Sequence, residues 1–195
     1  MHIAIHDIRR KMKNVSPSMK PQDVVILLKI IAIDNDNWHQ KPLAEALKMS
    51  QSEISQSVAR SQFSGLLDGS GKKVMCLSLM EFLQFGLTYV FPQKPGPVVR
   101  GMPTAHSALP LNKNIISNEH FVWPTANGNV RGHGIIPLYQ SVPEASTRDS
   151  KLYELLALAD ALRVGKVRER EMAVKELKKQ ILHGEYQKSY SPFND

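Results

Sequence analysis

With 195 residues, of which 42% are hydrophobic and 22% charged, the chain is long enough for one or two domains with a real core. Its net charge of +7 and pI near 9.5 favour a polyanionic partner, although total charge bears on association and not on fold. No run approaches the ~18 apolar residues of a membrane span, and the start lacks the apolar core of a signal peptide. We therefore expect a cytoplasmic protein with no membrane partner, and the lone Cys76 excludes an intrachain disulfide.

Residues 1–20 form a basic arm. Its cations are Arg9, Arg10, Lys11, Lys13 and Lys20. Two interpretations stay open: an arm that follows the phosphates of a nucleic acid, or a solvated and partly helical leader.

Residues 21–33 are apolar almost all round, interrupted by Lys29. Pro21 suits a first helical position and Asp23 a first turn, so these signals and the length favour a buried helix over a buried strand. In the loop 34–40, Trp38 is expected to close over the core.

Residues 41–67 predict two short helices separated by a tight turn. Pro42 suits the start of the first helix, which ends before Met49. Ser50 followed by Glu53 is a capping box that starts the second helix. The inward positions are Leu43, Ala44 and Leu47 in the first helix and Ile54 and Val58 in the second, with Leu66 and Leu67 beyond.

The outward face of the second helix carries short polar side chains and one guanidinium, which suit hydrogen bonds to base edges in a major groove. Leu43-Ala44, Leu47, Met49-Ser50, Ile54-Ser55 and Val58 resemble the helix-turn-helix of winged-helix DNA-binding proteins, the MarR-like regulators in the broad sense. The resemblance implies a helix that inserts into the major groove from Ser50 onward. The expected DNA-binding residues are Gln51, Ser52, Ser55, Gln56, Arg60 and Lys41.

A turn at 68–71 and an extended segment or short strand at 72–77 follow. Ser78 with Glu81 forms a second capping box, which predicts a helix that ends at Val90, before Pro92. A standard winged helix places two strands and a wing directly after the recognition helix. The intervening helix therefore puts a wing in doubt.

Residues 92–147 are rich in proline and glycine, so helix is not expected over most of this segment. We predict short strands at 98–100 and 130–138, with Arg100–His106 pairing with Asn129–Gly134. Apolar anchors that include Trp123 predict an ordered cover over the helical core, with Trp123 buried. Residues 91–162 are also similar to bacterial winged-helix proteins of unassigned role, some of them associated with nucleotidyltransferase toxins.

Residues 148–184 predict two helices that form a hairpin, broken at Gly165, and residues 185–195 a frayed tail. The first helix has one apolar stripe. The second mixes its basic residues with acidic ones, which indicates a solvated face more than a nucleic-acid surface.

Catalytic and metal-binding patterns are absent from the sequence. There is no phosphate-binding loop, and the seven histidines and one cysteine show no zinc-like spacing. His106 beside Ser107 and His133 beside Arg131 fit hydrogen-bonded structural histidines better than a triad. We expect no enzymatic activity, no cofactor and no metal.

The fold predicted is therefore mainly α. It has a helix-turn-helix domain at 21–91, an irregular or minor-β cover at 92–147 and a helical pair at 148–184. The favoured function is sequence-specific binding of double-stranded DNA as a bacterial transcriptional regulator. The alternative is an antitoxin-like protein-interaction partner, for instance of a nucleotidyltransferase toxin, with DNA binding secondary; RNA binding through the arm is a weaker third. We also predict a two-fold homodimer through the apolar helix at 24–33, the C-terminal hairpin, or both.

Overall fold

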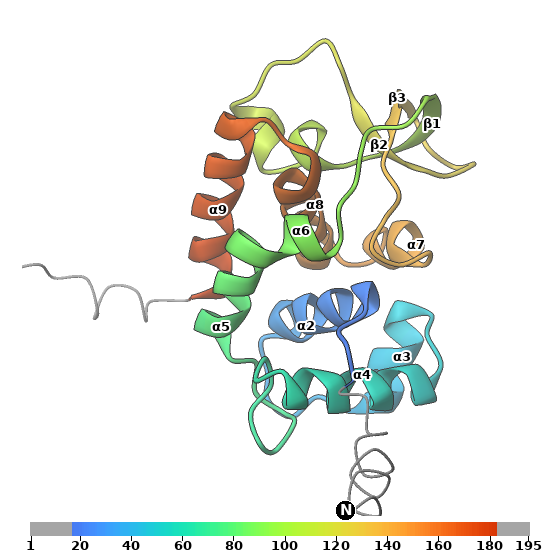
Figure 1. The fold of residues 1–195 in the computed structure, drawn as a ribbon. Helices are drawn as coiled ribbons and strands as arrows, with labels where there is room; N and C mark the ends of the chain where they lie inside the picture. Colours follow the sequence, from blue (N-terminus) through green and yellow to red (C-terminus); the bar gives the residue numbers. More distant parts are fainter. Residues whose placement is uncertain (1–16, 183–195) are drawn as a thin grey trace, which may run out of the picture.

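The computed structural model describes residues 17–182, so most of the basic arm and the tail lie outside the described residues. The chain is mainly helical and carries one small three-stranded sheet, which confirms the mainly-α prediction (Figure 1). Helices α2, α3 and α4 form one end of the molecule and the sheet forms the other, with α8 between them.

The first three helices are α2 (Pro21–Ile33), α3 (Gln40–Leu47) and α4 (Gln51–Phe63). Pro21 begins α2 as predicted, and α2 is a buried helix. The predicted start of α3 is wrong by two residues, because the helix begins at Gln40. Pro42 is tolerated in its first turn, where backbone N–H groups have no intrahelical partner.

The turn between α3 and α4 is set by local signals. Lys48 closes α3 in the left-handed conformation, with φ of 54°. The predicted capping box is confirmed: Ser50 Oγ accepts from the Glu53 amide at 3.1 Å, and Glu53 Oε2 accepts from the Ser50 amide at 2.9 Å. These bonds satisfy two amides that the helix leaves unpaired at its start.

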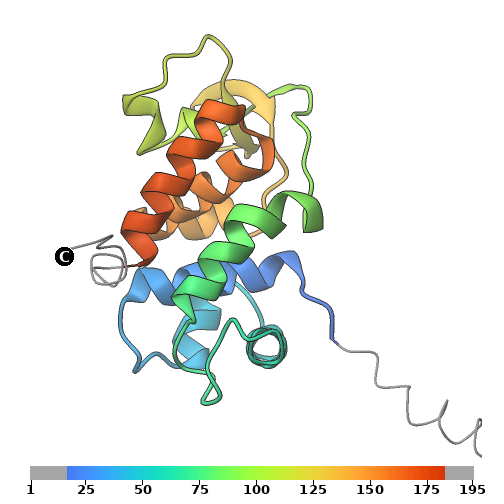
Figure 2. The same cartoon turned by 60° about the vertical axis from the view of Figure 1, so that its left-hand side comes forward.

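A continuous helical segment follows, made of α5 (Cys76–Glu81), the π-helical turn η1 (Phe82–Gly86) and α6 (Leu87–Val90). It runs along the surface of the molecule (Figure 2). The second predicted capping box is wrong, because the helix begins at Cys76 and Ser78 lies inside it. Its start is fixed instead by a backbone bond from the Met75 amide to Leu66 O at 3.0 Å.

The sheet contains β1 (Val98–Pro103), β2 (Phe121–Pro124) and β3 (Val130–Gly134). The predicted pairing is confirmed in part: β1 runs antiparallel to β3, with Arg100 opposite Arg131, but of the predicted segment 100–106 only Arg100 and Gly101 pair with β3. The strand β2 was not predicted; it pairs antiparallel with β1 and parallel with β3. Gly101 permits this closure, since a Cβ there would lie 2.2 Å from Trp123 O. The short turns η2 (Ala105–Ser107) and η3 (Leu111–Lys113) connect β1 to β2.

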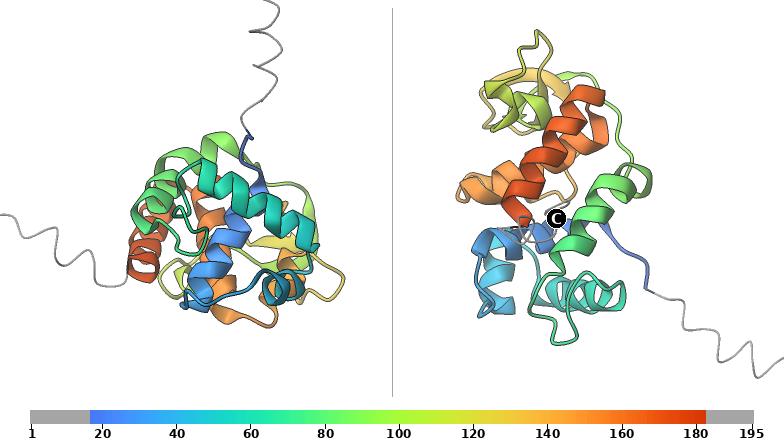
Figure 3. Two further views of the ribbon diagram at one scale, coloured as in Figure 1. Left: turned by 90° about the horizontal axis from the view of Figure 1, so that it is seen from below. Right: turned by 90° about the vertical axis from the view of Figure 1, so that its left-hand side faces the viewer.

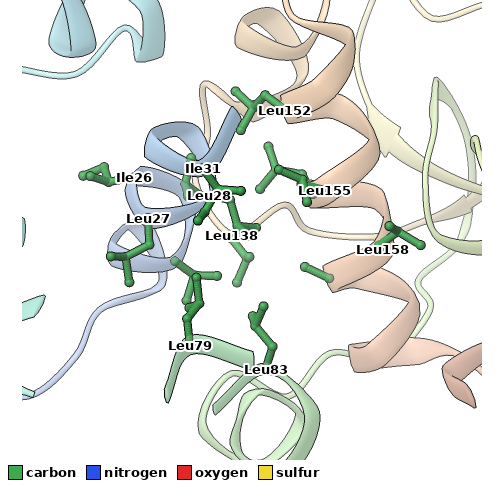
Figure 4. Close-up of a cluster of buried hydrophobic side chains, with 14 of the residues drawn as sticks. Ile26, Leu27, Leu28, Ile31, Leu79, Leu83, Leu138, Leu152, Leu155 and Leu158 are labelled. Carbon is green, nitrogen blue, oxygen red and sulfur yellow. The ribbon is translucent and has the colours of Figure 1, made fainter. Parts of the chain in front are cut away.

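The chain ends in α7 (Val142–Ser146), α8 (Ser150–Val164) and α9 (Val167–Ile181). The helical pair broken at Gly165 is as predicted, but α8 is buried on all sides and not along one stripe. Figure 4 shows leucines of α8 facing α2, α5, η1 and Leu138.

This burial weakens the premise of the dimer prediction. That prediction assumed that α2 and the C-terminal hairpin leave apolar surface uncovered. Within one chain, Leu27 and Leu28 of α2 and Leu155 of α8 are each 0% exposed. Much of the apolar surface of these elements is therefore used within the chain, and the dimer through them stays a prediction.

Candidate nucleic-acid interface

The inner side of α4 fixes its position against α2 and α3. Ile54 and Val58 are buried as predicted, and Ser57 and Ser61 are buried beside them at 0% exposure. Small hydroxyl side chains let the helices approach closely. The result is a rigid support for whatever the other side of α4 contacts.

The outer side of α4 is exposed to solvent. Gln51, Ser52, Ser55 and Gln56 are all exposed, and Gln56 Nε2 donates to Ser52 Oγ at 3.1 Å. Seen from below, α4 lies across the end of the molecule (Figure 3, left). This side does not pack against the cover at 100–140. The side chains predicted to contact bases thus share one open face.

Arg60, the remaining predicted contact on α4, does not belong to this face. It is 7% exposed, and its Nε and Nη2 donate to the Asp23 carboxylate at 2.8 and 2.6 Å. Asp23 is itself fully buried, and its Oδ2 also accepts from the Lys20 amide at 2.8 Å, at the start of α2. The prediction that Arg60 points outward to phosphate or guanine is wrong, because its guanidinium forms an ion pair that joins α4 to α2. No local signal marks this pair, since its members are 37 positions apart.

Lys41, on the first turn of α3, is exposed as a phosphate contact requires. Lys48, in the turn before α4, lies 3.7 Å from Glu144. With Arg60 buried, α4 itself presents no exposed cation. A ring of basic residues around the face is therefore not seen on α4.

The cover segment holds the α3–α4 turn in place. Tyr139 donates its hydroxyl to Glu53 Oε1 at 2.6 Å, and Ser141 Oγ donates to Leu47 O at 2.5 Å. The Tyr139 hydroxyl, followed by the amide and hydroxyl of Ser50, lowers the pKa of Glu53 below its ordinary value. These two hydrogen bonds were not predicted. They join a segment far along the chain to the first turn of α4.

A compact loop follows α4 and is closed by a single bridge between Leu67 and Val74. Asp68 Oδ1 accepts from the Lys72 and Lys73 amides at 2.9 and 3.0 Å. Together with the Ser70 hydroxyl, which contributes most, these bonds lower the pKa of Asp68 to about 2. The Lys72 ammonium lies 4.6 Å from the Trp38 ring centroid, so Trp38 packs beneath this loop.

Lys73, on the same loop, is exposed. Gln62 of α4 donates to Gly69 O at 3.0 Å, which places the loop against the end of α4. The loop therefore adds an exposed cation beside the C-terminal end of α4.

The histidine sites do not form a triad. His106 Nε2 faces Glu119 O at 2.9 Å, and its Nδ1 lies 3.5 Å from Glu169 Oε2, so both ring nitrogens face protein oxygens. Ser107 Oγ accepts from the Phe121 amide at 2.9 Å. A nucleophilic serine would instead donate to an imidazole nitrogen. Within residues 17–182, no three His, Cys, Asp or Glu side chains are grouped to hold a metal.

A buried polar cluster anchors the sheet to α8. Asp160 is 1% exposed and accepts from Thr104 Oγ1 at 3.0 Å, Trp123 Nε1 at 2.5 Å and Arg163 Nη1 at 2.7 Å. Burial raises the pKa of Asp160, and Arg163 opposes that shift. Trp123 is 1% exposed, which confirms its predicted burial. Thr104, Trp123 and Arg163 each donate to this one carboxylate, as in a structural cluster.

Comparison with protein-family models, with curated proteins and with solved structures finds no match. Among the described helices, none is long and apolar enough to cross a membrane.

Proposed function

We propose that the protein binds double-stranded DNA with sequence preference and inserts α4 into the major groove, as a transcriptional regulator does. The observation that carries this proposal is the open face of α4. Its exposed residues Gln51, Ser52, Ser55 and Gln56 are short donors and acceptors on a rigidly held helix. Side chains of this kind pair with base edges, and Gln can make two bonds to adenine.

The surroundings of α4 supply candidate phosphate contacts. Lys41 on α3 and Lys73 on the loop after α4 are exposed on elements that pack against it. The chain enters α2 at Lys20, whose charge acts on Glu53 in the first turn of α4. The basic residues at 9–13 precede Lys20 by seven to eleven positions in the sequence and lie outside the described residues. Phosphate contacts position a protein while base contacts specify the sequence.

The arrangement also supports a helix-turn-helix more than a full winged helix. The turn between α3 and α4 spans Lys48–Ser50, and the loop at 68–73 takes the place where a wing would begin. The sheet of β1, β2 and β3 comes only after α6.

The test is fluorescence anisotropy with the DNA upstream of the protein's own gene and with a scrambled duplex of equal length, over a salt series. We expect tighter binding to the upstream duplex and a linear fall of log K with log salt. Equal affinity for both duplexes would reject sequence-specific recognition. No binding at low salt would leave the interaction-partner alternative as the better account.

A further inference from the structure

The helical segment Cys76–Val90 leaves large apolar side chains in solvent. Leu77, Phe85 and Tyr89 are 59%, 65% and 83% exposed, whereas Leu83 and Leu87 on the inner side are 0% exposed. The inner side anchors the segment to the core. Its outer side crosses the surface of the molecule (Figure 2). Contiguous exposed apolar surface on a protein of this size marks an interaction site.

The π-helical turn aligns these residues. Leu77, Glu81, Phe85 and Tyr89 recur every fourth residue; we call them the α5–α6 stripe. In a regular α-helix, each step of four residues rotates by ~40°, so such a stripe winds around the helix. The wider turn at Phe82–Gly86 holds more residues per turn, which turns the residues after it back toward the same side. The segment thus presents Leu77, Phe85 and Tyr89 along one exposed side, with Glu81 among them.

We propose that the α5–α6 stripe is the contact surface for a second copy of this chain. The two segments pack antiparallel about a two-fold axis that passes beside Phe85. A two-fold contact uses the same patch on both protomers, so the patch must complement itself.

Self-complementarity selects this register. Glu81 is the sole charged residue within Cys76–Val90. An axis at Phe85 places Glu81 opposite the partner's Tyr89, whose hydroxyl can donate to the carboxylate. An axis at Glu81 would place two carboxylates face to face, which is unfavourable. The register at Phe85 therefore buries the apolar residues and satisfies the one charge.

The exposed area fits a dimer of ordinary size. A whole aromatic side chain can bury roughly 150–250 Å². At their exposed fractions of 65% and 83%, Phe85 and Tyr89 together leave roughly 220–370 Å² to be covered. A standard interface has about 800 Å² per partner, of which roughly 450–520 Å² is apolar. The two aromatic rings supply roughly two fifths to four fifths of that, and Leu77 and Val90 extend it.

Sedimentation equilibrium of the full chain, from low to high micromolar concentration, tests this inference, which does not depend on DNA binding. We expect a reversible dimer, and Phe85→Glu should raise its dissociation constant at least thirtyfold, about the loss of a central aromatic anchor. Phe63→Glu is the matched control, because Phe63 on α4 is also 65% exposed; it should leave the constant within about twofold. Circular dichroism confirms that each variant is folded. A wild-type monomer at every concentration, or a dimer that Phe85→Glu leaves intact, overturns the proposal.

A charge exchange tests the register. Tyr89→Glu should weaken the dimer by placing a carboxylate opposite the partner's Glu81. Adding Glu81→Lys should restore association through an intermolecular ion pair. The two positions lie eight residues apart on one helix, so they do not pair within a protomer. Absence of rescue overturns the two-fold arrangement.

Discussion

Removal of the Arg60 guanidinium should destabilise the whole fold and not merely weaken DNA binding. Arg60→Ala leaves the Asp23 carboxylate at 0% exposure without its bidentate partner. Breaking a buried ion pair in this way costs about 3–5 kcal/mol of the free energy of unfolding. For a chain of this size, that loss lowers the Tm by roughly 6–20 °C. The stability of Arg60→Lys should lie between those of wild type and Arg60→Ala, because an ammonium cannot reproduce the two parallel hydrogen bonds.

Urea denaturation followed by circular dichroism measures this loss. The control is Gln51→Ala on the exposed side of the same helix, which should change stability by less than about 0.5 kcal/mol. The double variant Asp23→Leu/Arg60→Met should recover much of the loss, because no charge is left buried. Recovery stays incomplete, since Asp23 also accepts the Lys20 amide at the start of α2. If Arg60→Ala costs under about 1 kcal/mol and instead lowers the salt dependence of DNA binding by about one unit, Arg60 acts at a phosphate and the structural role is refuted.

Two further predictions concern the loop after α4 and the cover segment. The hydrogen bonds to the Asp68 carboxylate lower its pKa from 3.8 to about 2. The stability that this carboxylate contributes to the fold is therefore present above its unfolded-state pKa and is lost as the pH falls through about 2. Asp68→Asn should therefore lose less stability than wild type between about pH 4 and 2 in urea titrations. An equal loss of unfolding free energy in the two proteins over this pH range would contradict this. Asp160→Ala leaves the buried Arg163 charge unpaired and should cost about 3–5 kcal/mol. Brief trypsin treatment should leave segment 92–147 of the wild-type protein intact and cut this segment in Asp160→Ala. Equal cleavage of the two proteins would show that the Asp160 cluster does not hold the cover in place.

Local signals explain what the sequence predicted correctly. The Ser50–Glu53 capping box spans three positions, and the break at Gly165 follows directly from the helical pattern. The predicted pairing of 100–106 with 129–134 found the right two segments from their shared glycine-containing pattern, although the observed register joins 98–101 with 130–133. Such features depend on neighbours in the chain, so they need no knowledge of the tertiary fold.

The unpredicted parts of the site depend on residues distant in sequence. Arg60 and Asp23 are 37 positions apart, and Tyr139 and Glu53 are 86 apart. Arg60 sits beside the apolar positions of α4, so only the packing of α2 decides that it turns inward. Asp160 lies among apolar neighbours on α8, and two of its three donors, Thr104 and Trp123, come from distant segments. Helical periodicity locates a face but cannot assign the partner of a buried charge.

The central claim, that the open face of α4 contacts bases, is tested most directly by Gln56→Ala. The measurement is the ratio of affinities for upstream and scrambled duplexes, obtained by fluorescence anisotropy at one salt concentration. Loss of a bidentate base contact should reduce this ratio by about 5- to 150-fold, equivalent to ~1–3 kcal/mol, with scrambled-duplex affinity nearly unchanged. The control is Asn112→Ala, an exposed amide on η3, which packs against η2 and α9; this variant should keep the wild-type ratio. A wild-type ratio for Gln56→Ala, in a folded protein that still prefers its upstream DNA, would contradict base contact by Gln56 and the orientation of α4 in the groove.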